Sequence, residues 1–318
     1  MSSASSPPIR LVIRLLLEFM VSAMPALARW HGGDLVRGVI FLAIAQANRP
    51  RLSDPVRRAG IRGDEDLRPI SVMAIAQSLR LPYETARRRV RHLERLGLVE
   101  RREQGIVVPG AVIASREFED FAAGTYVLFL RMLRGLRAVG FDFASFGKAA
   151  PLADSEPALD EAPDAAVRHV VIDFILRMVE CGLAAHDDDF LRALIFSAIM
   201  SANAEPYTAD PAAAWNYATL AQSPPEHRRK PVTVAEIAAR TGIPYETTRR
   251  YVAAMLRDKD VVRVSGKGVI NPQQSPRDAR LHQSGAVIMS RFIQLIGDLT
   301  RLGFSFDTLQ IENRRTAA

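Results

Sequence analysis

Apolar residues recur along this chain with helical spacing. Residues 10–29 form one dense apolar run and residues 34–47 a second, and we expect a helix over each. A long amphipathic helix is expected over residues 114–139. Asp34 precedes the second helix where an N-cap is expected, and Asp189 stands before the matching run later in the chain. The pattern predicts a mainly helical fold.

Two shorter helices, joined by a tight turn, are expected between the second helix and the long one. Ser71 is expected to cap the first of them. Its counterpart Thr233 has Glu236 three residues later, which is the spacing of a capping box. Pro82 and Pro244 suit the first position of the second short helix.

The helix after Pro82 has two unlike faces at 100° per residue. The stripe predicted to be buried consists of Ala86, Val90, Leu93 and Gly97. The opposite face consists of Glu84, Arg88, Arg91 and Arg95, flanked by Thr85, Arg87 and His92. Alternating residues then surround a turn at residues 103–105, which predicts a small β-hairpin.

The chain contains an internal repeat. Residues 81–90 read Leu-Pro-Tyr-Glu-Thr-Ala-Arg-Arg-Arg-Val, and residues 243–252, 162 positions later, read Ile-Pro-Tyr-Glu-Thr-Thr-Arg-Arg-Tyr-Val. One register step later, residues 105–109 match residues 268–272. Duplication of a whole domain accounts for this similarity, since a match over such a length is not expected by chance.

The repeat predicts the domain boundaries. The first helices align with Val12 on Val171. The segment between the repeats carries three prolines and five acidic residues, which is typical of a flexible linker. We expect a disordered tail over 1–8, a first repeat over 9–149 (helix-turn-helix 70–98, wing 98–109), an acidic linker over 150–166, a second repeat over 167–311 (helix-turn-helix 232–260, wing 261–272) and a tail over 312–318.

The charge balance favours an acidic partner. The chain of 318 residues has 42 Lys and Arg against 35 Asp and Glu, a net charge of +7, and all but four of the basic residues are arginine. Such an excess attracts nucleic acid or an anionic membrane surface, although arginine bias can also reflect a GC-rich genome. The single cysteine, Cys181, excludes an internal disulfide and suggests a buried thiol in a reducing cytoplasm.

The apolar run at Ile9–Ala28 resembles a signal peptide or a membrane span in composition. Arg14 and Glu18 interrupt it four residues apart, as on a helix surface. A similar segment recurs at Val171–Ala184, in the middle of the chain. We therefore interpret both as amphipathic core helices and expect no membrane partner.

Residues 70–109 and 232–272 resemble the winged helix-turn-helix of bacterial regulators in the MarR and GntR classes. The residues that carry the resemblance are Ile75, Ala76, Pro82, Thr85, Arg88, Val90, Leu93, Gly97, Leu98 and Val99. It implies a mainly α fold with small β-wings: two tandem winged-helix domains forming a pseudo-two-fold pseudo-dimer. Its recognition helices, 82–96 and 244–258, would lie roughly 34 Å apart, one DNA turn. Lys259-Asp260 replaces Gly97-Leu98 in the second half, which departs from the pattern at the turn.

The resemblance places the recognition helices in the major groove, where Arg suits guanine, Glu suits cytosine and further arginines contact phosphates. The expected DNA-binding residues of the first half are Tyr83, Glu84, Thr85, Arg87, Arg88, Arg91, Arg95, Arg101 and Arg102. Those of the second half are Tyr245, Glu246, Thr247, Arg249, Arg250, Arg257, Arg263 and Lys267.

A structural interpretation of some of these residues stays open. Glu84–Arg88 and Glu246–Arg250 would also form surface ion pairs worth about 0.2–0.5 kcal/mol. The two tyrosines would also serve as packing residues. The first half is expected to bind phosphate more strongly, because Arg89, Arg91 and His92 are replaced by Tyr251, Ala253 and Ala254.

Catalytic signals are weak. The six histidines are scattered, and no phosphate loop, dinucleotide fingerprint or zinc spacing occurs. Residues 187–189, three aspartates, suit a solvated loop or helix start better than a metal site. Trp30, Trp215 and Tyr217 suit core packing better than a ligand pocket between the halves. We expect no enzyme activity, no cofactor and no metal.

The residues together predict a sequence-specific regulator of transcription that binds double-stranded DNA. We expect it in the cytoplasm, associated with the nucleoid, as a monomeric pseudo-dimer or a homodimer, and leave open a small-molecule effector. The alternatives are a plasmid or phage replication initiator with tandem winged helices and a winged-helix module for protein interaction.

Overall fold

Helices dominate the computed structural model, which describes residues 7–49, 64, 67–146, 163–208, 210–306 and 309. The fold is 68% helix, with two small antiparallel sheets. Of the expected tails (1–8 and 312–318) and linker (150–166), only residues 7–8 and 163–166 fall within the described part.

The first half contains long helices that the apolar pattern located to within two residues. Its elements are α1 (Ile9–Trp30), α2 (Leu35–Asn48), α4 (Val72–Ser78), α5 (Tyr83–Arg95), β1 (Glu100–Arg102), β2 (Gly105–Val107), α6 (Gly110–Ile113), α7 (Arg116–Ala138) and the 3-10 helix η2 (Phe143–Ser145).

The second half repeats the order of two helices, two short helices, a hairpin and a long helix. Its elements are α8 (Pro163–Ala185), α9 (Phe190–Thr208), α10 (Pro211–Asn216), η3 (Glu226–Arg228), α11 (Val234–Thr241), α12 (Tyr245–Arg257), β3 (Val262–Val264), β4 (Gly268–Ile270) and α13 (Asp278–Arg301). Helix α8 begins at Pro163, inside the expected linker.

The helix caps match the sequence prediction, with one correction. Asp34 accepts a hydrogen bond from Arg37 N at 3.0 Å, and Asp189 accepts one from Arg192 N at 3.0 Å. Ser71 caps α4, and the capping box of α11 is formed. Pro82 and Pro244, however, are N-cap residues and not the first helical residues, because their ψ angles of 135° and 139° are extended.

Each hairpin is closed by a third short segment of chain. Glu100 pairs with Val107 in the first hairpin and Val262 with Ile270 in the second, both antiparallel. Residues 70 and 232, which precede α4 and α11, form single bridges to β2 and β4. Gly105, at φ 146°, lies so close to this segment that a Cβ would come within 2.7 Å of the residue 70 carbonyl oxygen. A side chain is excluded there.

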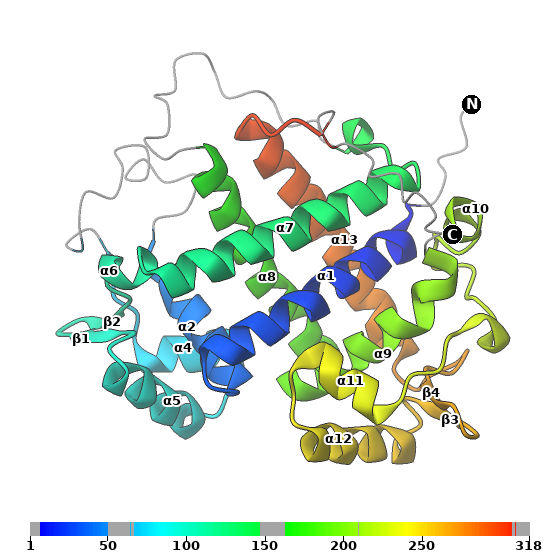
Figure 1. Ribbon diagram of the computed structural model, residues 1–318, viewed down its shortest axis with the longest axis horizontal. Helices are drawn as coiled ribbons and strands as arrows, with labels where there is room; N and C mark the ends of the chain where they lie inside the picture. Colours follow the sequence, from blue (N-terminus) through cyan, green and yellow to red (C-terminus); the bar gives the residue numbers. More distant parts are fainter. Residues whose placement is uncertain are drawn as a thin grey trace.

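The two halves share one core. Helix α1 contacts α2 and α7 of its own half and also α9, α11 and α13 of the second half. Helix α8 in turn contacts α9 and α13 and also α2 and α7 of the first half (Figure 1). One cluster of buried hydrophobic residues includes members of both halves. The tandem domains expected from the repeat therefore do not have separate cores.

Helix α1 lies at the centre of this core. It is the one described helix long and apolar enough to cross a membrane, and 67% of its most apolar window is buried in the protein. Glu18 is exposed as expected. Arg14, by contrast, is buried, at 8% exposure. Its guanidinium donates hydrogen bonds to the carbonyl oxygens of residues 214 and 217. Cys181 is buried, as predicted.

A buried asparagine connects the second helix of each half to its hairpin. Asn48 donates to the carbonyl oxygens of residues 68 and 106 and accepts from the amide of residue 108 at 2.8 Å. Asn203 donates to residues 230 and 269 and accepts from the amide of residue 271 at 2.9 Å. The two side chains are 1% and 0% exposed. They fix each hairpin to the end of a core helix.

We predict that Asn48→Ala and Asn203→Ala each lower the free energy of unfolding by about 3 kcal/mol, because each leaves buried peptide groups without partners at about 1–3 kcal/mol per group. Urea unfolding followed by circular dichroism measures this. Asn216→Ala, at an exposed position on α10, is the control and should change stability by less than about 0.5 kcal/mol. Equal stabilities of all three variants would contradict the assigned role.

Two buried histidines occupy corresponding places after α1 and α8. His31 is 1% exposed and His186 is 3% exposed, and each ring lies against a phenylalanine, Phe41 or Phe196. Burial lowers the pKa of His31 to about 4, with a further lowering by Arg37. Burial likewise lowers the pKa of His186 to about 4. Both rings are neutral in the folded chain near pH 7.

A histidine with a lowered folded pKa favours folding above its unfolded pKa, near 6.5, and this contribution is lost as the pH falls towards 4. Between pH 7 and pH 5 we expect each histidine to reduce the free energy of unfolding by about 2 kcal/mol. His31→Leu should remove its share of this loss, measured by urea unfolding at both pH values. His227→Leu, whose ring is exposed, is the control. An unchanged pH dependence in His31→Leu would count against the buried neutral ring.

Candidate nucleic-acid interface

The two short helices α4 and α5 meet at a tight turn, and α11 and α12 meet at its counterpart. The turn at Arg80 has φ 49°, and Gly242 at the matching position has φ 70°. Arg80 forms an ion pair with Asp188 of the second half at 3.0 Å. This contact between the halves was missed by the sequence analysis, since nothing in the repeat marks either residue as a partner of the other.

Helix α5 buries the predicted apolar stripe against α2 and α4. Ala86, Val90 and Leu93 are fully buried. The prediction that Gly97 belongs to this stripe is wrong. Gly97 follows the end of the helix and is exposed, with φ 68°. In α12 the buried residues are Thr248, Val252 and Met255. The opposite faces of both helices are therefore turned to solvent.

The first turn of each helix contains an ion pair, but with a different arginine from the one expected. Glu84 pairs with Arg87 at 2.8 Å, and Glu246 pairs with Arg249 at 2.9 Å. The hydrogen bond to Glu84 raises the pKa of Arg87. The pairs of Glu84 with Arg88 and of Glu246 with Arg250, which the sequence left open as an alternative, are absent among the described residues. In both helices the glutamate pairs with the arginine three residues later.

On α5, α12 and the two hairpins, the exposed basic groups without an ion-pair partner among the described residues differ between the halves. In the first half they are Arg88, Arg91 and Arg95, all on α5. In the second half they are Arg250 and Arg257 on α12 and Arg263 and Lys267 on the hairpin. Exposed basic residues outside these elements that also have no ion pair in the described part of the chain include Arg29, Arg131, Arg228 and Lys259. A groove along α5 is lined by Glu84, Thr85, Arg87, Arg88, Arg91, Glu94 and Arg95.

The hairpin arginines of the first half are engaged within the protein. Arg101 pairs with Glu94 of α5 at 2.8 Å. Arg102 donates to the Asp64 carbonyl oxygen at 2.6 Å. In the second half, Arg263 and Lys267 are exposed. The free positive charge is thus concentrated on the helix in one half and divided between helix and hairpin in the other.

Two of the three basic residues of α5 that α12 lacks, Arg89 and His92, have a structural role. Arg89 forms an ion pair with Asp34 at 3.2 Å, and its replacement Tyr251 donates to Asp189 at 3.2 Å. Burial and the neighbouring Asp189 raise the pKa of Tyr251 to about 12. His92 contacts Arg37 at 2.8 Å. Of the three, only Arg91 adds a free cation to the exposed face, so the halves differ less in free charge than the sequences suggested.

A tyrosine and a threonine lie in the first turn of α5 and of α12, at the N-terminal ends of the basic faces. Tyr83 is 42% exposed and Tyr245 is 51% exposed, so each residue is about half open to solvent. Thr85 and Thr247 are half-buried within the first turn of each helix. The structure thus places every expected residue of α5 and α12 near solvent, with Arg87 and Arg249 already paired.

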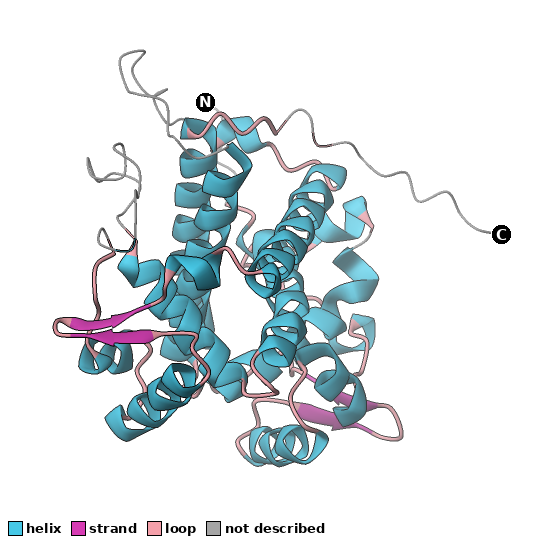
Figure 2. Ribbon diagram, turned by 60° about the vertical axis from the view of Figure 1, so that its left-hand side comes forward, coloured by secondary structure: helices cyan, strands magenta, loops and turns pink. Residues whose placement is uncertain are grey.

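Helices α5 and α12 lie along the same edge of the molecule. In Figure 1 both are at the bottom of the view, and the two hairpins project from opposite flanks. The view in Figure 2 keeps the hairpins on opposite flanks and the two helices below the bundle. A single extended partner could therefore contact both helices at once.

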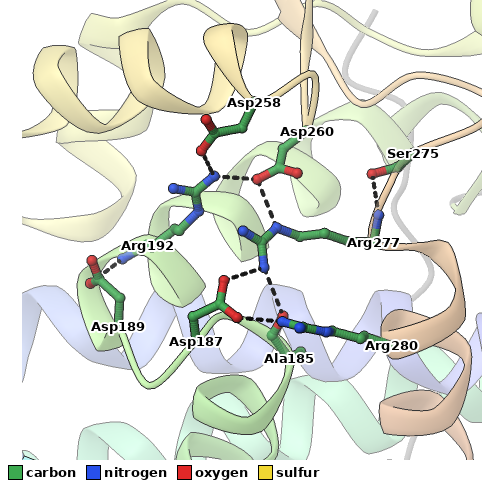
Figure 3. Close-up of polar contacts among 9 residues, drawn as sticks. All are labelled: Ala185, Asp187, Asp189, Arg192, Asp258, Asp260, Ser275, Arg277 and Arg280. Atoms are coloured by element: carbon green, nitrogen blue, oxygen red, sulfur yellow. Dashed lines mark hydrogen bonds and ion pairs between the residues drawn. The ribbon is translucent and has the colours of Figure 1, made fainter.

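The turn after α12 keeps its shape despite the change in sequence. Lys259 has φ 60°, close to the φ of 68° at Gly97, so a lysine here adopts the left-handed conformation of the glycine. Asp260 replaces a half-buried leucine and is 1% exposed. It accepts hydrogen bonds from Arg192 of α9 and from Arg277 at the start of α13 (Figure 3). These charges stabilise the turn of the second half.

The same network extends to the aspartates at residues 187–189. Arg277 and Arg280 both contact Asp187, and these hydrogen bonds lower the pKa of Asp187 (Figure 3). Asp189 is the cap of α9. The described residues contain no cluster of three His, Cys, Asp or Glu side chains suited to a metal ion. Asp187 and Asp189 make contacts within the second half, and Asp188 connects it to Arg80 of the first.

We predict that Asp260→Ala lowers the free energy of unfolding by about 3–5 kcal/mol, because Arg192 and Arg277, at 13% and 14% side-chain exposure, would lose a buried carboxylate. Denaturant unfolding is the measurement. Asp258→Ala is a matched control on the same arginine: Asp258 is 48% exposed, and its loss should cost less than about 1 kcal/mol. A similar cost for both variants would refute the role of Asp260.

Comparison of the chain with protein-family models, curated proteins and solved structures gives no match.

Proposed function

We propose that this protein is a sequence-specific regulator of transcription that binds double-stranded DNA with two winged helix-turn-helix modules in one chain. The observation that supports it best is the position of α5 and α12 on the same edge of the molecule, each with exposed arginines that have no ion-pair partner in the described part. Unpaired arginines clustered on one helix face suit phosphate and guanine.

On this proposal, the N-terminal ends of α5 and α12 enter successive major grooves. Arg88 and Arg250 occupy matching positions, and both are exposed. They are the candidates for bidentate contacts to guanine, while Arg91, Arg95 and Arg257 contact phosphates. Glu84 and Glu246 orient the neighbouring Arg87 and Arg249 in the free protein.

The two modules are proposed to bind their half-sites differently. The first relies on the three free arginines of α5. The second adds Arg263 and Lys267 of the hairpin, which in a winged helix lies beside the DNA backbone. We therefore expect an imperfect palindrome with half-sites one helical turn apart.

The test begins with genomic fragments recovered with the protein. Arg88→Ala combined with Arg250→Ala should weaken binding to the best fragment at least about 25-fold in gel shift, because each lost bidentate contact is worth about 1–3 kcal/mol. Arg116→Ala, 91% exposed on α7, is the control and should bind as the parent does.

A second variant separates the roles of the arginines. Arg91→Ala should reduce the slope of log affinity against log salt concentration by about 1 without changing the preferred fragment, as expected for a phosphate contact. Parent-like binding by the double variant would overturn the proposal, and so would failure to recover any preferred fragment.

A further inference from the structure

A cavity of about 370 Å³ lies between the two halves, away from α5 and α12. Helices α1, α8, α9 and α13, labelled in Figure 1, form its walls, and the chain after α10 closes one end. Most of the wall is apolar, with Leu16, Leu17, Met20, Met24, Met178 and Val179 among its residues. Tyr217 lines it as well, whereas Trp30 and Trp215 do not. The volume is within the range of small-molecule sites.

One end of the cavity is strongly basic. Arg10, Arg14 and Arg229 all line it, and Arg14 and Arg229 are 8% and 5% exposed. Asp278 also lines the cavity and acts on Arg10 and Arg229 through its charge, while its carboxylate accepts a hydrogen bond from the amide of residue 275. His282 contacts Arg10 at 3.4 Å. Three guanidinium groups and one carboxylate therefore line this cavity, and Glu226, outside the lining, also acts on Arg229 through its charge.

Arg14 is the more deeply buried of the two cavity arginines that have a guanidinium nitrogen without a hydrogen-bond partner among the described residues, the other being Arg10. Its Nη2 donates to the carbonyl oxygens of residues 214 and 217 at 2.8 and 3.3 Å, and its guanidinium lies 5.2 Å from the centre of the Tyr207 ring. Its Nη1 is buried and has no hydrogen-bond partner, and Arg14 has no ion pair in the described part of the chain. Burial lowers the pKa of Arg14 to about 10.

A buried cation without a counter-ion is costly, and a bound anion would offset that cost. The apolar remainder of the cavity, in turn, would take up hydrocarbon and release its water. We propose that this cavity binds an amphipathic carboxylate, with its carboxylate group at Arg14 and its apolar body among the methionines and leucines of α1 and α8. This proposal does not depend on the DNA-binding function.

A purely structural role for Arg14 makes a different prediction. Its bonds to residues 214 and 217 would by themselves connect α1 to the chain after α10. In that case the sign of a ligand's charge would not matter. A series of ligands with the same apolar chain and different head groups therefore separates the two roles without altering the protein.

The experiment is calorimetric titration of the full chain, without DNA, below micelle-forming concentrations. Decanoate should bind at one site per chain, at least tenfold more tightly than decanol, and decyltrimethylammonium should not bind. From hexanoate to decanoate, each methylene should tighten binding about fourfold until the cavity is filled. Comparison with 2-naphthoate distinguishes an aromatic from an aliphatic carboxylate.

Two variants complete the test. Arg14→Met should lose at least tenfold in decanoate affinity and keep its affinity for decanol. Arg29→Met, exposed on the same helix and outside the cavity, should match the parent. If circular dichroism shows that Arg14→Met is unfolded, Arg10→Met takes its place with the same expectation. Equal affinities for decanoate and decanol, or no saturable binding of any carboxylate, would overturn the proposal. Since no DNA is present, neither result bears on the proposed function.

Discussion

The first helix of each half packs against the other half, and the other features of the structure depend on this packing. Helix α1 contacts α9, and α8 contacts α2, so the second helix of each half is held by the first helix of the other. These contacts are made by large apolar side chains and remove them from water, which is the main favourable contribution to folding. The two halves therefore cannot form their cores independently, although their element order is the same.

The second helices transmit this packing to the candidate interface. At the start of each, the capping aspartate contacts the exposed helix of its own half, through Arg89 in one case and Tyr251 in the other. Asn48 at the end of α2, and Asn203 in the C-terminal part of α9, hold the hairpins. Helix α5 and the first hairpin are thus both attached to α2, and α12 and the second hairpin are both attached to α9. The orientation of α5 relative to α12 therefore depends on how α1 and α8 pack against α9 and α2.

Much of this arrangement could be predicted from the sequence, because it is local. Apolar periodicity located the long helices, and the caps and the repeat located the short ones. The buried face of α5 followed from helical geometry at Ala86, Val90 and Leu93. Non-local contacts could not be predicted. Nothing local distinguishes Arg14, which is buried, from Glu18, which is exposed, since both interrupt the same apolar run.

The same reason explains which contacts at the candidate site the sequence did not reveal. Arg102 and Arg89 look like their neighbours in sequence, but their partners Asp64 and Asp34 are remote along the chain. Lys259-Asp260 departs from the winged-helix pattern at the turn, and Arg192 and Arg277 bind Asp260 there. Ion pairs between distant segments depend on the tertiary fold, which a single sequence pattern does not specify.

Carrying both halves on one chain has a consequence for divergence. In a homodimer every substitution occurs twice, so a site at the subunit interface and its symmetry mate change together. Here the position aligned with Arg14 holds Asp173, which contacts Gln46 and Arg177. One copy of the interface can therefore specialise while the other remains a structural contact, and whatever occupies the cavity at Arg14 would do so with a stoichiometry of one per chain.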